Sequence, residues 1–168
     1  MQRRRFLQLL STAMAGASLA SLEVKAKEFE VMKTDEEWRR SLTSEQYSVL
    51  RHEATERPGS SCLLNEHREG TFVCAGCDQP VFKSGTKFES GTGWPSFWKP
   101  IDGAIGTKTD RSLWEVRTEV HCNRCGGHLG HVFKDGPPPT GLRYCMNGVA
   151  LKFIPSGESS ADGDRSSC

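Results

Sequence analysis

The sequence has almost no excess of either charge and no long apolar run. Its 168 residues include 22 Lys and Arg against 21 Asp and Glu, a net charge of +1. A balanced chain has no field that attracts a polyanion, so we expect neither a nucleic-acid partner nor binding to an anionic membrane surface. No internal repeat is visible, which argues against a repeat architecture. With 36 % hydrophobic residues, the chain is that of a soluble protein with one modest core.

The N-terminal apolar run, residues 9–22, is too short and too rich in small residues to predict a membrane span. No cysteine follows it, so we expect no lipoprotein anchor or other stable membrane anchor. The preceding segment Arg3–Leu7 resembles a bacterial twin-arginine export signal. We predict that residues 1–26 form such a signal, cleaved after Ala20 or Ala26, and that the protein is periplasmic or otherwise extracytoplasmic. The alternatives are an uncleaved N-terminal anchor or a disordered tail.

Two short helices are expected at the start of the folded domain. Thr34 precedes three acidic residues, which suit the first turn of a helix. Thr43 and Gln46 form a capping box, and the second helix is expected to run to about His52. The predicted parts of the chain are the signal (1–26), a linker (27–33), the domain (34–155) and a disordered tail rich in Ser, Gly and Asp (156–168).

The rest of the domain is predicted to be antiparallel β-sheet, because short segments rich in β-branched and aromatic residues alternate with Gly/Pro-rich turns. The alternation is clearest along residues 114–120. There Trp114, Val116 and Val120 are expected on one face and Glu119 on the other. The expected strands are residues 70–73, 80–82, 113–120, 131–133 and 150–154.

Two CxxC turns are the strongest chemical signal in the chain. Two cysteines three apart on a tight turn place both sulfurs on one side of a metal, and zinc takes four such ligands in a tetrahedron. The 44 residues between the pairs mean that the metal would join distant parts of one domain. Two disulfides, or a redox-active CxxC on a thioredoxin-like unit, are the alternatives, but no parallel-sheet pattern is visible. We predict one structural Zn²⁺ bound by Cys74, Cys77, Cys122 and Cys125.

Cys145 is the candidate for a reactive thiol. Arg143 could hold its thiolate by charge, and the amide of Asn147 could donate a hydrogen bond. His128 and His131 follow the second CxxC turn and could supply a proton donor. From the residues alone, two alternatives stay open: Cys145 as a small buried hydrophobe, and the histidines as spare zinc ligands.

Trp94 lies on a glycine-rich loop, residues 90–98. An aromatic ring on such a loop could form a pocket for a soft apolar group such as a thioether methyl. The alternative is structural packing under the loop.

Together these motifs resemble the methionine-R-sulfoxide reductases, the B type, from about Thr34 to Pro155. They occur in the family's order, which is far more specific than any one of them. The motifs are CAGC (74–77), GTGWPSF (91–97), RTEV (117–120), HLGHVF (128–133), DGPPPTG (135–141) and RYCMN (143–147). The resemblance implies a mainly β fold, with two rolled antiparallel sheets preceded by short helices. It also implies a zinc site on the face away from the active site.

The resemblance also implies a reaction. Cys145 would attack the sulfoxide sulfur, releasing methionine and leaving a sulfenic acid that a thioredoxin-like or other thiol donor recycles. The implied substrate is oxidised methionine in proteins or peptides, or free, and a monomer is expected. The implied site residues are Trp94 and Phe133 for substrate binding, His128, His131 and Asn147 for the sulfoxide oxygen, and Arg143 beside the nucleophile.

The sequence departs from part of the family at Thr92, where many members have a cysteine that resolves the sulfenic acid. The resemblance favours Cys62 as the replacement, with Cys168 or an external thiol as alternatives. Two rivals to the enzyme remain. One is a zinc-ribbon module that binds a partner through its loops, and the other is a catalytically inactive zinc store.

Overall fold

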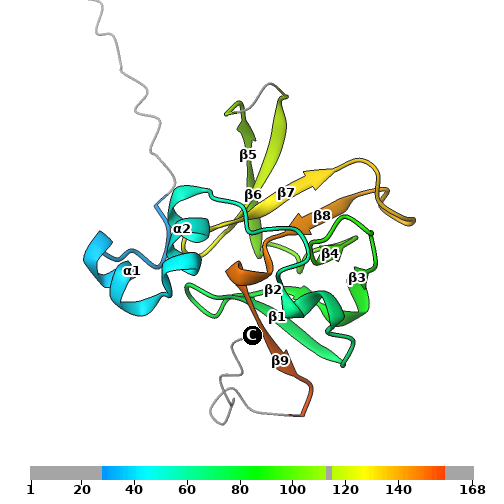
Figure 1. Ribbon diagram of the computed structural model, residues 1–168, viewed down its shortest axis with the longest axis horizontal. Helices are drawn as coiled ribbons and strands as arrows, with labels where there is room; N and C mark the ends of the chain where they lie inside the picture. The colour runs from blue at the N-terminus through cyan, green and yellow to red at the C-terminus, as the bar shows by residue number, and fades with distance from the viewer. Residues whose placement is uncertain (1–27, 113–114, 158–168) are drawn as a thin grey trace, which may run out of the picture.

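The computed structural model describes residues 28–112 and 115–157 and contains two short helices and two antiparallel sheets (Figure 1). The predicted fold class is therefore confirmed. The expected signal at 1–26, the tail from residue 158 onward and the pair 113–114 lie outside the described residues. Within the described part, no helix has the length and apolar character needed to cross a membrane.

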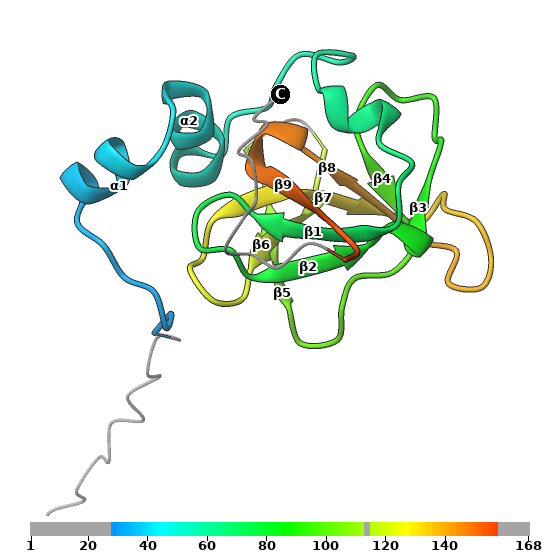
Figure 2. The same cartoon turned by 90° about the horizontal axis from the view of Figure 1, so that it is seen from below.

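The helices are α1 (Asp35–Ser41) and α2 (Ser44–His52); both start where the sequence predicts, and α2 also ends at the predicted His52. Each begins with a capping box, in which Thr34 and Thr43 accept hydrogen bonds from the backbone N–H three residues on, at 3.3 and 3.2 Å. Both helices lie at one end of the sheets (Figure 2). There α2 packs against β7 (His128–Phe133).

The strands form a three-stranded sheet of order β2-β1-β9 and a six-stranded sheet of order β3-β4-β8-β7-β6-β5. The first contains β1 (Gly70–Cys74), β2 (Pro80–Lys83) and β9 (Leu151–Pro155). The second contains β3 (Lys87–Phe88), β4 (Ser96–Phe97), β5 (Ile105–Asp110), β6 (Arg117–Cys122), β7 and β8 (Arg143–Met146). Single turns of 3₁₀ helix are η1 (Cys62–Asn65), η2 (Ser84–Thr86) and η3 (Gly148–Ala150).

The core lies between the two sheets. Phe72 and Phe82 of the small sheet meet Phe97 of the large sheet, and none of the three is exposed. The Phe82 and Phe97 rings stack with their centroids 4.3 Å apart, and the Phe72 ring meets Phe97 edge-on at 4.9 Å. Burial of three aromatic rings provides a large share of the hydrophobic stabilisation in a domain of this size.

The expected strands β1, β2 and β9 are confirmed to within two residues, but the alternation expected along residues 114–120 is wrong. β6 begins only at Arg117, Val116 is 60 % exposed, and Glu119 is buried at 2 % exposure. Glu119 is held in the interior by a hydrogen bond with the buried His128 on β7 and by an ion pair with the exposed Lys108 on β5. β5 and β8 were missed, because their mixed polar composition gives no clear alternating pattern.

The segment before α1, which the sequence predicted to be a linker, contains no helix or strand among its described residues. It nevertheless contacts the turn after β6. The backbone N–H of Val31 donates to the carbonyl of Arg124 at 3.0 Å, and Glu30 forms an ion pair with the Arg124 guanidinium at 3.0 Å.

Candidate active site

Cys145 lies within β8, in the middle of a row of residues that crosses the large sheet. In antiparallel pairing, residues directly opposite one another place their side chains on the same face. Ser96 on β4 is opposite Cys145, Cys145 is opposite His131 on β7, and His131 is opposite Glu119 on β6. Lys108 on β5 completes the row. The pairing therefore puts the thiol between a hydroxyl and an imidazole.

His128 and His131 are three residues apart, a spacing that places side chains on opposite faces of a regular strand. The pairing of β6 with β7 shifts register between Val120 and His121, which adds one residue to β7 between the histidines. This β-bulge returns both imidazoles to the same face, with ring centroids 5.4 Å apart.

Glu119 fixes the ring of His128. Its Oε1 lies 2.9 Å from His128 Nδ1, and its Oε2 lies 2.9 Å from the ammonium of Lys108. Burial alone would raise the pKa of Glu119, but the bonds from His128 and Lys108 lower it on balance. The carboxylate is therefore ionised and accepts the Nδ1–H of His128. Nε2 of His128, buried and without a partner among the described residues, is left to interact with a bound molecule.

Asp110 fixes His131 in the same way, since its Oδ2 lies 2.8 Å from His131 Nε2. Hydrogen bonds from the hydroxyl and the backbone N–H of Ser112, and from His131, hold the pKa of Asp110 well below its usual range. Burial lowers the pKa of His131, although the carboxylate opposes it. A neutral His131 that donates through Nε2 has Nδ1 as an acceptor.

The Cys145 thiol is half-buried, unbonded to any other cysteine, and next to a cluster of three hydroxyl groups. Ser90 Oγ lies 2.8 Å from Thr92 Oγ1 and 2.7 Å from Ser96 Oγ, and Thr92 Oγ1 lies 3.9 Å from the sulfur. Burial raises the pKa of Cys145, while Thr92, the charge of Arg143 and Ser96 act in the opposite direction. The resting thiol therefore carries its proton at neutral pH.

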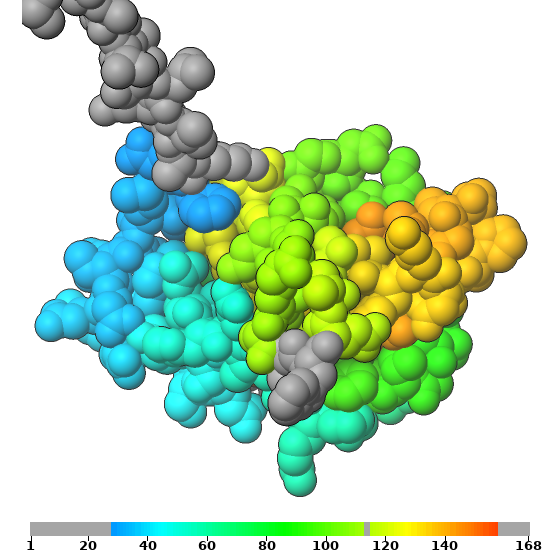
Figure 3. Space-filling model, turned by 90° about the horizontal axis from the view of Figure 1, so that it is seen from above, coloured from blue at the N-terminus to red at the C-terminus, as the bar shows by residue number. Residues whose placement is uncertain are grey.

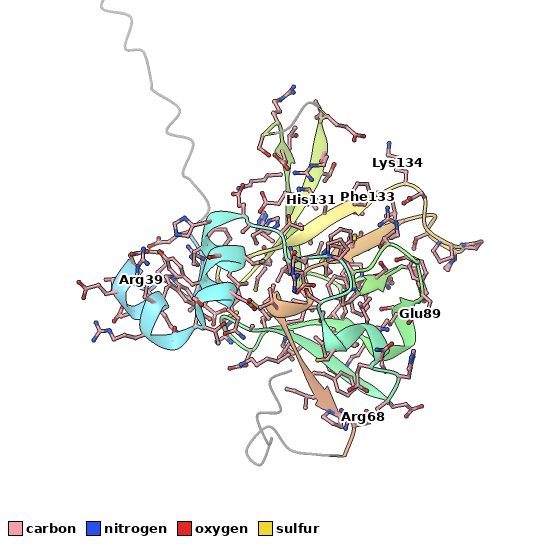
Figure 4. The ribbon with its side chains drawn as sticks, in the orientation of Figure 1. Arg39, Arg68, Glu89, His131, Phe133 and Lys134 are labelled. Atoms are coloured by element: carbon pink, nitrogen blue, oxygen red, sulfur yellow. The ribbon has the colours of Figure 1, made fainter. Side chains whose placement is uncertain are left out.

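Arg143 forms a bidentate ion pair with Asp135. Its Nε lies 3.0 Å from one carboxylate oxygen and an Nη 2.9 Å from the other. Such a bidentate pair fixes the plane of the guanidinium. The same guanidinium lies over the ring of Phe133, 4.5 Å from its centroid. Figure 4 shows Phe133 beside His131 on β7, and their ring centroids are 6.5 Å apart.

Trp94 and Asn147 are both held by the main chain of Glu56. Trp94 Nε1 donates to the carbonyl of Glu56 at 3.2 Å, and the N–H of Glu56 donates to Asn147 Oδ1 at 3.0 Å. Asn147 Nδ2 donates to the carbonyl of Leu129 at 3.2 Å. These two bonds define which amide atom is oxygen, and one Nδ2 hydrogen remains for a ligand. Gly93, with φ of +92°, lets this loop approach residue 58, where a Cβ would come within 2.8 Å of the proline.

The predicted site residues thus fall on three adjoining parts of the fold: β7, β8 with the turn after it, and the Trp94 loop. Four carboxylates hold the predicted residues in place and were not predicted from the sequence: Glu56, Asp110, Glu119 and Asp135. Glu119 and Asp135 were visible inside the RTEV and DGPPPTG motifs, but no pattern connected them to a partner. Asp110 and Glu56 lie outside every motif.

The four CxxC cysteines form the predicted cluster. Their sulfurs all lie within 4.8 Å of one another, and none of the four is in a disulfide, which argues against the two-disulfide alternative. Two of the contacts, Cys74 to Cys125 and Cys77 to Cys122, are 3.7 and 3.5 Å. A tetrahedron with Zn–S bonds of about 2.3 Å requires sulfurs about 3.8 Å apart. The set therefore fits a metal of this kind.

The cysteine cluster connects the two sheets. Cys74 is the last residue of β1 in the small sheet, and Cys122 is the last residue of β6 in the large sheet. The other cysteine of each pair lies in the turn that follows. A metal bound here would hold the two sheets together at the end where the helices pack, since Trp38 and Leu50 lie against Gly76.

Cys62, the predicted resolving residue, begins η1 and is disulfide-bonded. Cys145 is free, so this disulfide does not join the two. The structure thus leaves the resolving role of Cys62 as a prediction, which requires that this bond be reduced first.

Comparison with known proteins adds sequence relationships to this geometry. The SelR domain family matches residues 42–155. The protein named peptide methionine sulfoxide reductase MsrB from Pseudomonas putida is 56 % identical over 124 residues, 73 % of this chain and 93 % of the relative. The protein of that name from Leptospira interrogans is 52 % identical over 126 residues, 74 % of this chain and 96 % of the relative. The one from Methanosarcina barkeri is 55 % identical over 124 residues, 73 % and 87 % of the two chains.

Proposed function

The chain belongs to the SelR-domain, MsrB family of peptide methionine sulfoxide reductases, and from this premise we propose how its residues perform the reaction. The protein is an oxidoreductase that reduces methionine-R-sulfoxide to methionine with electrons from a thiol. Neither a zinc-ribbon binding module nor a zinc store is favoured, because the chain matches proteins named reductases over nearly the whole length of those proteins.

Cys145 is the nucleophile. Its sulfur attacks the sulfoxide sulfur and forms a sulfur–sulfur bond, while the sulfoxide oxygen takes up two protons and leaves as water. A water molecule then attacks the Cys145 sulfur, which breaks the sulfur–sulfur bond, releases the thioether and returns one proton. The products are methionine and a sulfenic acid on Cys145, so the substrate sulfur is reduced by two electrons and the thiol is oxidised by two. The raised pKa of the thiol means that its own proton is available at neutral pH to be passed toward the developing hydroxyl group.

The other site residues recognise the parts of the sulfoxide. The free Nδ2 hydrogen of Asn147 donates to the oxygen, and the ring nitrogens of His128 and His131 that the carboxylates leave open accept a hydrogen bond from the protonated oxygen or from a water beside it. Trp94 and Phe133 form the apolar wall for the methyl group. With an aromatic wall on one side of the substrate sulfur and polar groups on the other, the site fits only one configuration at that sulfur.

The observation that carries this assignment is the row across the large sheet, which places Cys145 between Ser96 and the carboxylate-bound His131. A single-turnover experiment tests it. In the Cys62→Ser variant, which lacks the proposed resolving thiol, one equivalent of a peptide R-sulfoxide should yield one equivalent of methionine and one sulfenic acid per chain, trapped by dimedone on Cys145. An adduct on another cysteine would contradict the assignment.

We propose that the cysteine cluster binds one structural Zn²⁺ through Cys74, Cys77, Cys122 and Cys125. The support is the sulfur spacing and the all-thiolate donor set, which suits zinc better than a hard cation. All four positions of the tetrahedron are taken by cysteine, so the ion has a structural and not a catalytic role. Elemental analysis should find one zinc per chain.

We propose that Cys62 resolves the sulfenic acid. Its thiolate would attack the sulfur of oxidised Cys145, forming a Cys62–Cys145 disulfide and water, and an external dithiol would then reduce that disulfide. The support is that Thr92, close to the nucleophile, carries no thiol. With the enzyme reduced beforehand, Cys62→Ser should leave the first turnover unchanged and slow thioredoxin-driven steady-state turnover about ten-fold or more. Unchanged steady-state turnover with thioredoxin would refute this role.

We propose that the protein is exported, on the basis of the paired arginines and short apolar run at its N-terminus. Its substrate would then be oxidised methionine outside the cytoplasm, its role the repair of proteins under oxidative stress, and its donor an exported thiol protein. Fractionation of the native host should find the processed chain in the periplasm, and loss of twin-arginine transport should retain the precursor inside. A chain of unprocessed size in the cytoplasm of normal cells would contradict export.

A further inference from the structure

Glu56 lies on the segment between α2 and η1, far in sequence from every motif. It is partly buried and contacts two separate regions of the site. Its main chain holds the indole of Trp94 and the amide of Asn147, as described above. Its carboxylate accepts hydrogen bonds from the backbone N–H groups of Gly148 at 2.6 Å and Val149 at 2.9 Å.

The carboxylate of Glu56 takes the place of a helix cap. Asn147 stands at the N-cap position of η3, where an asparagine side chain usually accepts a bond from the turn that follows. Here the Asn147 side chain makes no such bond, and Glu56 satisfies the first N–H groups of η3 instead. The Asn147 amide is thereby released from a local capping role.

The contact between Glu56 and η3 is close. A Cβ on Gly148 would lie 1.9 Å from Ser61 Oγ and 3.3 Å from Glu56 Oε1, so only glycine allows the segment to approach the turn this tightly. Through its four hydrogen bonds, Glu56 links the indole of Trp94 to the Asn147 amide and to the turn that follows it. The indole and the amide are the two groups assigned to the methyl and the oxygen of the substrate.

We propose that Glu56 is a positioning residue for sulfoxide reduction, which sets the placement of Trp94 relative to Asn147 by binding the turn that follows Asn147. This inference rests on the roles proposed above for those two residues. Glu56 touches neither Cys145 nor the cysteine cluster in the described structure, so its effect is on the substrate's orientation and not on the thiol.

The test is steady-state kinetics of the full-length protein with a peptide R-sulfoxide and dithiothreitol, which bypasses the need for a thioredoxin-like donor. Glu56→Ala removes both acceptors and should raise KM and lower kcat, with kcat/KM falling about ten-fold or more. Glu56→Gln keeps one acceptor oxygen and should retain an intermediate kcat/KM. The rate of Cys145 alkylation by iodoacetamide should stay at the wild-type value in both variants. Glu45→Ala removes an exposed carboxylate of α2 and serves as the matched control.

Trp94→Ala and Asn147→Ala, measured in parallel, separate the two levels of the proposal. If both lower kcat/KM but Glu56→Ala and Glu56→Gln stay within two-fold of wild type, the positioning role is refuted and the site assignment stands. If neither lowers kcat/KM, the assigned roles fail and the positioning role fails with them. If Glu56→Ala does not fold, Glu56→Gln decides: a lowered kcat/KM with unchanged alkylation supports the proposal, and wild-type kinetics overturn it.

Discussion

Replacing Cys145 by serine is expected to abolish reduction of methionine-R-sulfoxide. A hydroxyl in the same place is a far weaker nucleophile toward sulfur than a thiol, and removal of a nucleophile typically costs on the order of 10³-fold or more in kcat. Cys145 is half-buried in the middle of β8, and a serine side chain is only slightly smaller than a cysteine side chain, so the variant should still fold. The measurement is single-turnover methionine formation from a peptide R-sulfoxide.

The matched comparison for this variant is Cys62→Ser, for which the first turnover is expected to proceed at the wild-type rate. Both variants should keep one zinc per chain and the wild-type circular dichroism spectrum. Turnover in Cys145→Ser within ten-fold of wild type would mean that another thiol performs the chemistry, and the assignment of the nucleophile would be wrong.

Removing the metal is expected to be the most destabilising change that leaves the sequence intact. The cluster ties the end of β1 in the small sheet to the end of β6 in the large sheet, and four thiols brought together without a metal have no comparable attraction. Structural zinc contributes on the order of 10 kcal/mol to folding in small domains. Even half of that would lower the unfolding temperature by about 15 °C or more.

The measurement is thermal unfolding before and after chelation, with zinc content followed by elemental analysis. Cys122→Ser should reproduce the chelated state, whereas Cys145→Ser should keep both zinc and the wild-type unfolding temperature. Complete loss of zinc with an unchanged unfolding temperature would contradict the structural role of the cluster.

The parts of the site that could be predicted from sequence are those that depend on short-range patterns. The CxxC turns bring two ligands together within four residues, and the capping boxes at Thr34 and Thr43 define helix starts locally. The RYCMN motif places Arg143 and Asn147 on either side of Cys145. Each of these is a relation within one turn or one strand, and each is found in the structure.

The four supporting carboxylates could not be predicted in the same way, because Asp110 and Glu119 depend on strand register, and Glu56 and Asp135 depend on how loops outside the strands return to the site. Glu119 was expected on the face opposite Val120, and no local pattern predicted its partners. Pairing with β5 and β7 brings it between Lys108 and His128, which both compensate the burial of its carboxylate. A β-bulge in β7, which no local sequence pattern predicts, places His128 on the same face of the sheet as His131. The surface of this region, formed by the β5–β6 hairpin between the helices and the β7–β8 turn, appears in Figure 3.

The central claim is that this site reduces one configuration of methionine sulfoxide through Cys145. The most direct test is dithiothreitol-driven reduction of the separated R and S epimers of a peptide methionine sulfoxide by the folded protein, with Cys145→Ser alongside. The R epimer alone should be reduced, and the variant should reduce neither epimer. Equal reduction of both epimers, or no reduction of either by folded protein, would contradict the central claim.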